Sequence, residues 1–153
     1  MSYATPADVK ACFRNFATGS EAAVTDAKIQ SWLDAKFAMI NGKINTLYSP
    51  IVVADSPESV KILKEIEAFL VAGIVDDVLN TYAEADKKPQ WEKRGMMMLN
   101  ELVPGKDKDG KQPEPTTKLP DAVYIGTRAQ TAQPKISSGN SNGPTFIKGG
   151  DNW

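Results

Sequence analysis

The chain of 153 residues contains no histidine and a single cysteine, Cys12. Without histidine it lacks the commonest general base, the Ser–His and Cys–His nucleophile pairs and the ligands of most zinc sites. One cysteine cannot form an internal disulfide. The longest apolar run, residues 69–75, is too short to span a bilayer, and the first residues lack the pattern of a secretory signal. The sequence therefore predicts no enzyme activity, no cofactor and no metal.

Excess charge of either sign is also missing. Lys and Arg total 18 against 19 Asp and Glu, which gives a net charge of −1. Proteins that bind DNA tightly without sequence preference usually present a basic face. The segment 26–48 carries only Lys28, Lys36 and Lys43 as cations. The charge balance thus argues against strong DNA binding.

The composition changes near Pro104. Before this point, apolar residues are dense and recur at helical spacing. From Pro104 onward the chain holds six of the ten prolines and seven of the eleven glycines, with few large apolar residues. Such a segment buries too little surface to offset its ordering entropy. We predict an all-α protein: a bundle of about four helices over 1–103, followed by an extended arm over 104–153 that contains short strand segments.

Local signals mark the first two helices. Thr5 is a predicted N-cap, with Pro6 at the first helical position and Asp8 closing a capping box. This helix should end at the turn residues 18–20. The second helix should begin after another cap, Thr25, and continue to the stop signal at 49–50.

The third predicted helix begins after Ser56 as its cap and runs to about Tyr82. Apolar residues surround most of it, which is typical of a buried central helix. A short fourth helix should follow Pro89.

Three patterns resemble chemical motifs without completing them. Residues 105–111 fit G-x-x-x-x-G-K, but Gln112 replaces the required hydroxyl and prolines follow it, so we interpret this stretch as a solvated turn. Asp107 and Asp109 lack the third acid and the closing Glu of a calcium loop. The adjacent carboxylates 76 and 77 point about 100° apart on a helix and should not share a site.

Several apolar residues are candidates for contacts with other subunits. Residues 96–98 are three methionines, which form either an adaptable contact surface or core filler. Trp32 is predicted in the core, Trp91 in the core or an interface, and Trp153 on the polar arm as an interaction anchor. The candidate interface residues of the bundle are Trp91, Met96, Met97 and Met98. The candidate partner-binding residues of the arm are Val123, Tyr124, Ile125, Phe146, Ile147 and Trp153.

The helical half resembles a known protein family. Residues 3–9, Y-A-T-P-A-D-V, followed by Phe13, resemble the opening Y-A-T-x-x-D-L of the head–tail connector (adaptor) proteins of tailed bacteriophages. Residues 25–29, T-D-A-K-I, resemble the start of their second helix, and Tyr48-Ser49-Pro50 resembles its aromatic–Pro exit. The resemblance covers roughly residues 3–100.

This resemblance implies a helical bundle that assembles into a homo-oligomeric ring, a dodecamer in the family. The ring would sit in the virion neck, with the portal protein above and a tail or stopper protein below. DNA would pass through its channel without specific binding, and assembly would take place in the host cytoplasm. The arm of about fifty residues is longer than in many members. We expect it to dock on other subunits rather than on its own bundle; a solvated tail is the alternative.

Two other functions remain open from the sequence. A small helical DNA-binding, packaging or regulatory subunit would need a basic helix face. A small enzyme or nucleotide-binding module would need a site, and the best candidate at 105–111 is incomplete.

Overall fold

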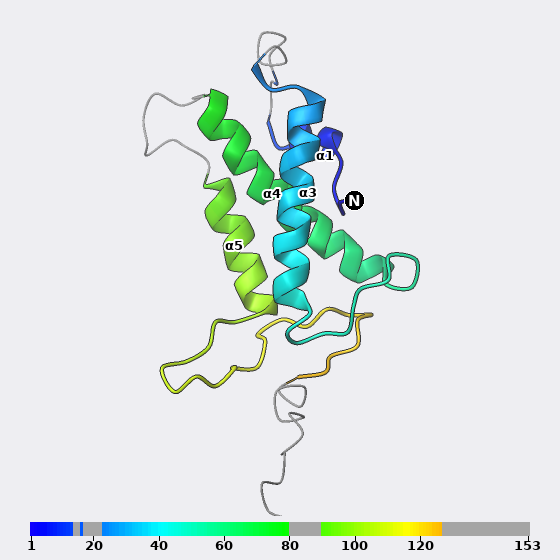
Figure 1. Ribbon diagram of the computed structural model, residues 1–153, viewed down its shortest axis with the longest axis vertical. Helices are drawn as coiled ribbons and strands as arrows, with labels where there is room; N and C mark the ends of the chain where they lie inside the picture. The colour runs from blue at the N-terminus through cyan, green and yellow to red at the C-terminus, as the bar shows by residue number, and fades with distance from the viewer. Residues whose placement is uncertain (14–15, 17–22, 80–89, 127–153) are drawn as a thin grey trace, which may run out of the picture.

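A computed structural model describes residues 1–13, 16, 23–79 and 90–126, and over these residues the protein is all-α (Figure 1). This confirms the predicted all-α class, whereas the described part of the predicted arm, residues 104–126, contains none of the expected strand segments. The long helix α4 contacts each of the other three, and α5 lies alongside it. Within the described part, the single β-type pairing is an antiparallel bridge between Tyr48 and Tyr124. The helices are α1 (Pro6–Ala11), α3 (Asp26–Ile44), α4 (Pro57–Leu79) and α5 (Trp91–Leu102).

The first two predicted caps are present. The Asp8 carboxylate accepts the Thr5 backbone N–H at 2.8 Å, while the Thr5 hydroxyl accepts the Asp8 N–H at 3.4 Å, so the capping box of α1 is complete. The Thr25 hydroxyl caps α3 by accepting the Lys28 N–H at 3.3 Å. These signals act within one turn of helix, which is why the sequence reveals them.

Two helix ends differ from the prediction. Helix α1 stops at Ala11, and the predicted end at 18–20 lies outside the described residues. Helix α3 ends at Ile44, before the expected stop at 49–50. The reason is that Leu47 and Ser49 form backbone hydrogen bonds with residues 123–126 and leave the helical path.

Ser56 occupies the predicted N-cap position of α4, since its carbonyl accepts the Val60 N–H at 2.9 Å, but its side chain does not cap the helix. Asp121, not Ser56, accepts the free amides of the first turn: its two carboxylate oxygens take the Glu58 N–H at 2.8 Å and the Ser59 N–H at 2.9 Å. The Ser59 hydroxyl also bonds to this carboxylate, and the Ser56 hydroxyl donates instead to the Asp121 carbonyl. The central helix is therefore capped by a residue 63 positions away from Glu58.

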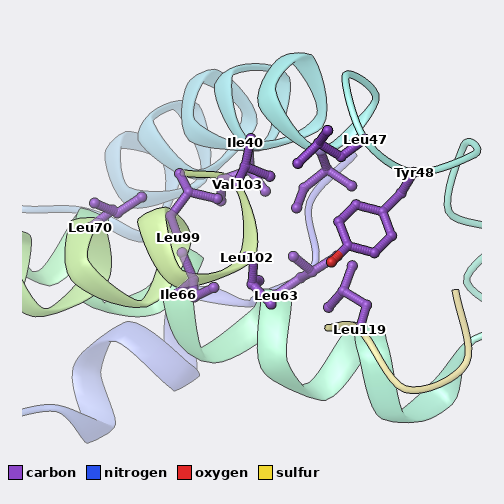
Figure 2. Close-up of a cluster of buried hydrophobic side chains, with 11 residues drawn as sticks. Ile40, Leu47, Tyr48, Leu63, Ile66, Leu70, Leu99, Leu102, Val103 and Leu119 are labelled. Atoms are coloured by element: carbon purple, nitrogen blue, oxygen red, sulfur yellow. The ribbon is translucent and has the colours of Figure 1, made fainter. Parts of the chain in front are cut away.

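The core consists of two clusters that meet along α4. Figure 2 shows the first cluster, in which α3, α4, α5 and the later segment around Leu119 contribute side chains. The second lies between α1, α3 and α4, and Trp32 packs against it as predicted. The first cluster comprises Ile40, Ile44, Leu47, Tyr48, Leu63, Ile66, Leu70, Leu99, Leu102, Val103 and Leu119. The second comprises Ala4, Val9, Val24, Ile29, Leu33, Ala68, Val71, Ala72 and Val75.

Part of the predicted arm packs on its own bundle, contrary to expectation. Leu119 is 3% exposed and belongs to the first core cluster. The Ser49 N–H donates to the Val123 carbonyl at 2.9 Å, and the Ile125 N–H donates to the Leu47 carbonyl at 2.9 Å. The expectation that the whole segment after Pro104 stays off the bundle is therefore wrong for residues 104–126. The low apolar content was misleading because a few well-placed residues suffice to hold an extended segment.

Two glycines allow α4 and α5 to pack closely. A Cβ atom built on Gly73 would lie 2.8 Å from the Cβ of Glu92 and 3.1 Å from its backbone nitrogen. A Cβ atom on Gly95 would lie 3.0 Å from Cγ of Leu70 and 3.2 Å from the Ile66 carbonyl oxygen. Both α4 and α5 thus have a glycine at the point where the other helix comes close.

We predict that Gly73→Ala destabilises the protein, although alanine is the better helix former, because the new methyl group would push α5 away from α4. The matched control is Gly42→Ala, inside α3, where a Cβ meets nothing within 4 Å. That change should stabilise the fold by about 0.5–1 kcal/mol. Urea unfolding of both variants measures the effects; equal stabilisation by the two changes would show that α4 and α5 are not in close contact.

Candidate partner-binding site

The four bundle residues predicted at an interface have different environments. Met97 is 56% exposed, whereas Met96 and Met98 are half-buried against the first core cluster. Trp91 is half-buried and stacks on Phe69, with ring centroids 5.4 Å apart and planes 20° apart. Of these residues, Met97 is therefore the one whose side chain is mainly free for another subunit.

A groove lies between α1, α4 and the start of α5. Its volume is about 510 Å³. The Arg94 guanidinium lies 4.6 Å from the centre of the Phe69 ring, and Lys64 pairs with Asp8 at 2.8 Å. Burial raises the pKa of the Cys12 thiol, which keeps it protonated and unsuited to nucleophilic attack. The charges of the groove are mixed, and they select no class of ligand. Lining residues include Asp8, Cys12, Lys61, Glu65, Trp91 and Arg94.

The arm residues 123–125 are divided between the bundle and solvent. Tyr124 is half-buried: its ring meets the Tyr48 ring edge-on at 5.5 Å, and Lys118 lies over it at 4.6 Å. Ile125 is also half-buried, but Val123 is 66% exposed. These three residues therefore already bind their own chain through the backbone, and Val123 alone points mainly outward. The predicted contacts of Phe146, Ile147 and Trp153 lie outside the described residues.

The stretch 105–111 is a turn, as the sequence indicated. The Asp107 carboxylate accepts the N–H groups of Asp109 and Lys111 at 2.9 and 2.8 Å. Gly110 has φ of 75°, the left-handed region that suits glycine. A phosphate would have to displace a carboxylate from these amides, so the turn does not form a phosphate-binding loop.

The other acidic candidates are not arranged as a metal site. Asp76 is 1% exposed, whereas Asp77 is exposed, so the two carboxylates have different surroundings, as their helical spacing predicts. Over the described ranges, no three His, Cys, Asp or Glu side chains come close enough together to bind an ion.

Sequence reasoning missed Glu67. Its side chain is fully buried in α4, and one carboxylate oxygen accepts the Ala4 N–H at 2.6 Å. Burial raises its pKa to about 7, although the Ala4 and Tyr3 amides favour the charged form. The available signal was its position one turn from Leu63 and Leu70, on the apolar side of the helix.

Comparisons with known proteins give no relative. No family model, no curated protein and no solved structure matches this chain. Among the described helices, none is both long enough and apolar enough to cross a bilayer.

The contact between Asp121 and α4 leads to a testable prediction. It concerns the part of the arm that packs on the bundle, residues 104–126, which we call the docked segment. Burial alone would raise the pKa of Asp121, but its hydrogen bonds with Ser59 and Glu58 outweigh this and lower the pKa. A lowered pKa in the folded state means that the contribution of Asp121 is present above the ordinary pKa of Asp, near 3.8, and is lost as the pH falls below that value.

We therefore predict that Asp121→Ala lowers the melting temperature at pH 7 and increases hydrogen exchange at the Ile125 amide. Asp121→Asn is the matched control, since asparagine does not ionise and keeps one of the two acceptor oxygens. It should retain part of the stability and lose the acid sensitivity below about pH 4. Unchanged exchange at Ile125 in the alanine variant would mean that the cap does not hold this segment.

Proposed function

We propose that this protein is a head–tail connector of a tailed bacteriophage. It forms a ring in the virion neck beneath the portal, receives the tail or a stopper protein below, and lets DNA pass without specific binding. It acts as a structural part and not as an enzyme. Assembly takes place in the host cytoplasm.

The observation that carries this proposal is the structural role of the residues shared with the family. In the first shared motif, Tyr3 packs on Phe37, with ring centroids 4.8 Å apart, and Thr5 with Asp8 forms the capping box of α1. In the second, Thr25 caps α3 and Ile29 is fully buried. These short motifs are thus the residues that begin helices and fill the core. This structural role supports a shared helical bundle rather than a coincidental similarity between short sequences.

The charges of α3 are more consistent with a DNA channel than with a DNA-gripping protein. Lys28, Lys36 and Lys43 share α3 with Asp26 and Asp34, so the charges of this helix nearly cancel. Retention of DNA is expected to be weak at moderate salt, where a basic face would still bind.

Lateral contact between copies is proposed at α5. Met97 is exposed beside a cavity of about 470 Å³ that Gln90, Lys93 and Arg94 also line. A ring needs a heterologous interface, in which one patch meets a different patch of the next copy. An exposed methionine within a polar rim suits the centre of such a patch, because its flexible thioether adapts to irregular surfaces.

We predict that Met97→Asp prevents ring assembly on portals, because it places a charge at an apolar contact. Met97→Leu, which keeps the volume and apolar character, should assemble normally. Both variants should fold, since the side chain is mainly exposed. Counting copies per portal by quantitative mass spectrometry of purified complexes measures the outcome, and full occupancy with the aspartate variant would rule out this interface.

The arm can be tested by truncation, provided that the part packed on the bundle, residues 104–126, is kept. Truncation after Val103 would remove Leu119 from the core and Asp121 from the start of α4. Truncation after Gly126 leaves both in place and isolates the remainder of the arm. The shorter chain should still fold with α1, α3, α4 and α5 in place, while heads and tails should fail to join. Normal joining by the truncated chain would show that residues 127–153 do not tether the neck.

A further inference from the structure

The first five residues form an N-terminal strap that lies across α3 and α4. Most of its side-chain contacts are with α3. The Tyr3 hydroxyl donates to the Asn41 side-chain oxygen at 2.5 Å, and Gln30 donates to the Ser2 hydroxyl at 3.0 Å. The Met1 amine pairs with Asp34 at 2.9 Å, at an exposed position. Ala4 is 2% exposed and belongs to the second core cluster.

Glu67 joins this strap to α4. Its Oε2 atom accepts the Ala4 N–H at 2.6 Å, and its side chain has no exposed surface. Its Oε1 atom is buried and has no hydrogen-bond partner among the described residues. A buried carboxylate with one oxygen unsatisfied is costly when charged and far less costly when protonated. Ionisation of Glu67 therefore weakens the docking of the strap, and docking of the strap disfavours ionisation of Glu67.

The neighbouring charges do not remove this conflict. Asp34 on α3 disfavours a second negative charge, whereas the Met1 amine favours it. On the side of α1, Asp8 is already paired with Lys64 at 2.8 Å. The Tyr3 hydroxyl has its own pKa raised by burial and, in smaller part, by Glu67. The dominant effect on Glu67 is burial, which raises its pKa to about 7.

We propose that Glu67 is a proton-controlled switch for the N-terminal strap: protonated Glu67 keeps residues 1–5 docked on the bundle, and ionised Glu67 favours their release into solvent. Release hydrates the carboxylate and frees Tyr3 from Phe37. It opens the adjoining cavity of about 610 Å³, whose lining includes Tyr3, Phe37 and Ile51. The switch depends on contacts within one chain and is independent of the proposed role in the phage neck.

The direction of the pH dependence follows from the raised pKa. The docked state holds a proton on Glu67 between the ordinary value of 4.5 and about 7, where the released state has lost it. Docking is therefore strongest below about pH 4.5, weakens as the pH rises, and levels off above about pH 7. Over the steep part, the opening constant can rise by up to about tenfold per pH unit.

Hydrogen exchange of the full-length chain tests the switch. The opening constant at the Ala4 amide, corrected for the intrinsic exchange rate, should rise by at least about tenfold between pH 5 and pH 8. The Leu70 amide reports opening of the core and should not follow this change. In Glu67→Gln, which keeps the acceptor and the shape but cannot ionise, the Ala4 opening constant should be independent of pH. The matched control is Glu65→Gln, an exposed position on the same helix, which should keep the native pH dependence.

A flat profile in the native chain would overturn the proposal, as would an unchanged pH dependence in Glu67→Gln. If that variant does not fold, the carboxyl carbon of Glu67 in the native chain can be titrated by NMR. A midpoint near 7 would support the switch, and a midpoint near 4.5 would overturn it.

Discussion

The structure depends on burying a helix that is apolar nearly all round. Helix α4 cannot expose any broad face to water, so its neighbours must cover it from several sides. Helices α1 and α3 cover one side around Val71 and Val75, and α5 covers the other around Leu70. Glycines at 73 and 95 let α5 approach closely enough to exclude water from this contact. The bundle is therefore organised around α4 and not around a symmetric four-helix core.

The start of α4 shows what can be predicted from the sequence and what cannot. Local signals predicted its first residues correctly, because Ser56, Pro57 and Glu58 are a familiar helix start. The group that satisfies the first amides is Asp121, which no local pattern could identify. Such a contact depends on the path of the whole chain. Neighbouring residues therefore predicted where the helix begins, but not which side chain accepts the N–H groups of its first turn.

The same distinction explains the arm. Its composition indicated a segment without a core of its own, and the described part indeed has no helix. Composition could not show that Leu119 joins the first core cluster near Leu63 and Tyr48, as Figure 2 shows. The boundary at Pro104 therefore marks a change of secondary structure, while the folded unit continues to at least residue 126.

The interface residues named from the sequence stay predictions, but the structure shows which of them are exposed. The exposure of Met97 agrees with a contact surface, whereas Trp91 is largely used within the bundle through its stack on Phe69. Glu67 was missed because a charged residue is ordinarily assigned to the solvent face. Its burial is visible only once the N-terminal strap is placed over it.

Two carboxylates are expected to give the bundle opposite responses to pH. The α4 amides stabilise the charged form of Asp121, so the arm segment that carries it should loosen in acid. Burial destabilises the charged form of Glu67, so the proposed switch should hold the strap best in acid. The N-terminal strap and the docked arm segment should therefore loosen under opposite conditions, which separates them experimentally.

The central functional claim is that copies of this chain assemble around a portal. The most direct measurement is the mass in solution, by light scattering, of the purified chain alone and mixed with a portal protein from the same genome. We predict that the mixture contains a complex heavier than the portal alone by many copies of the 16.6 kDa chain. A mixture in which the portal keeps its own mass and this chain remains separate would contradict it.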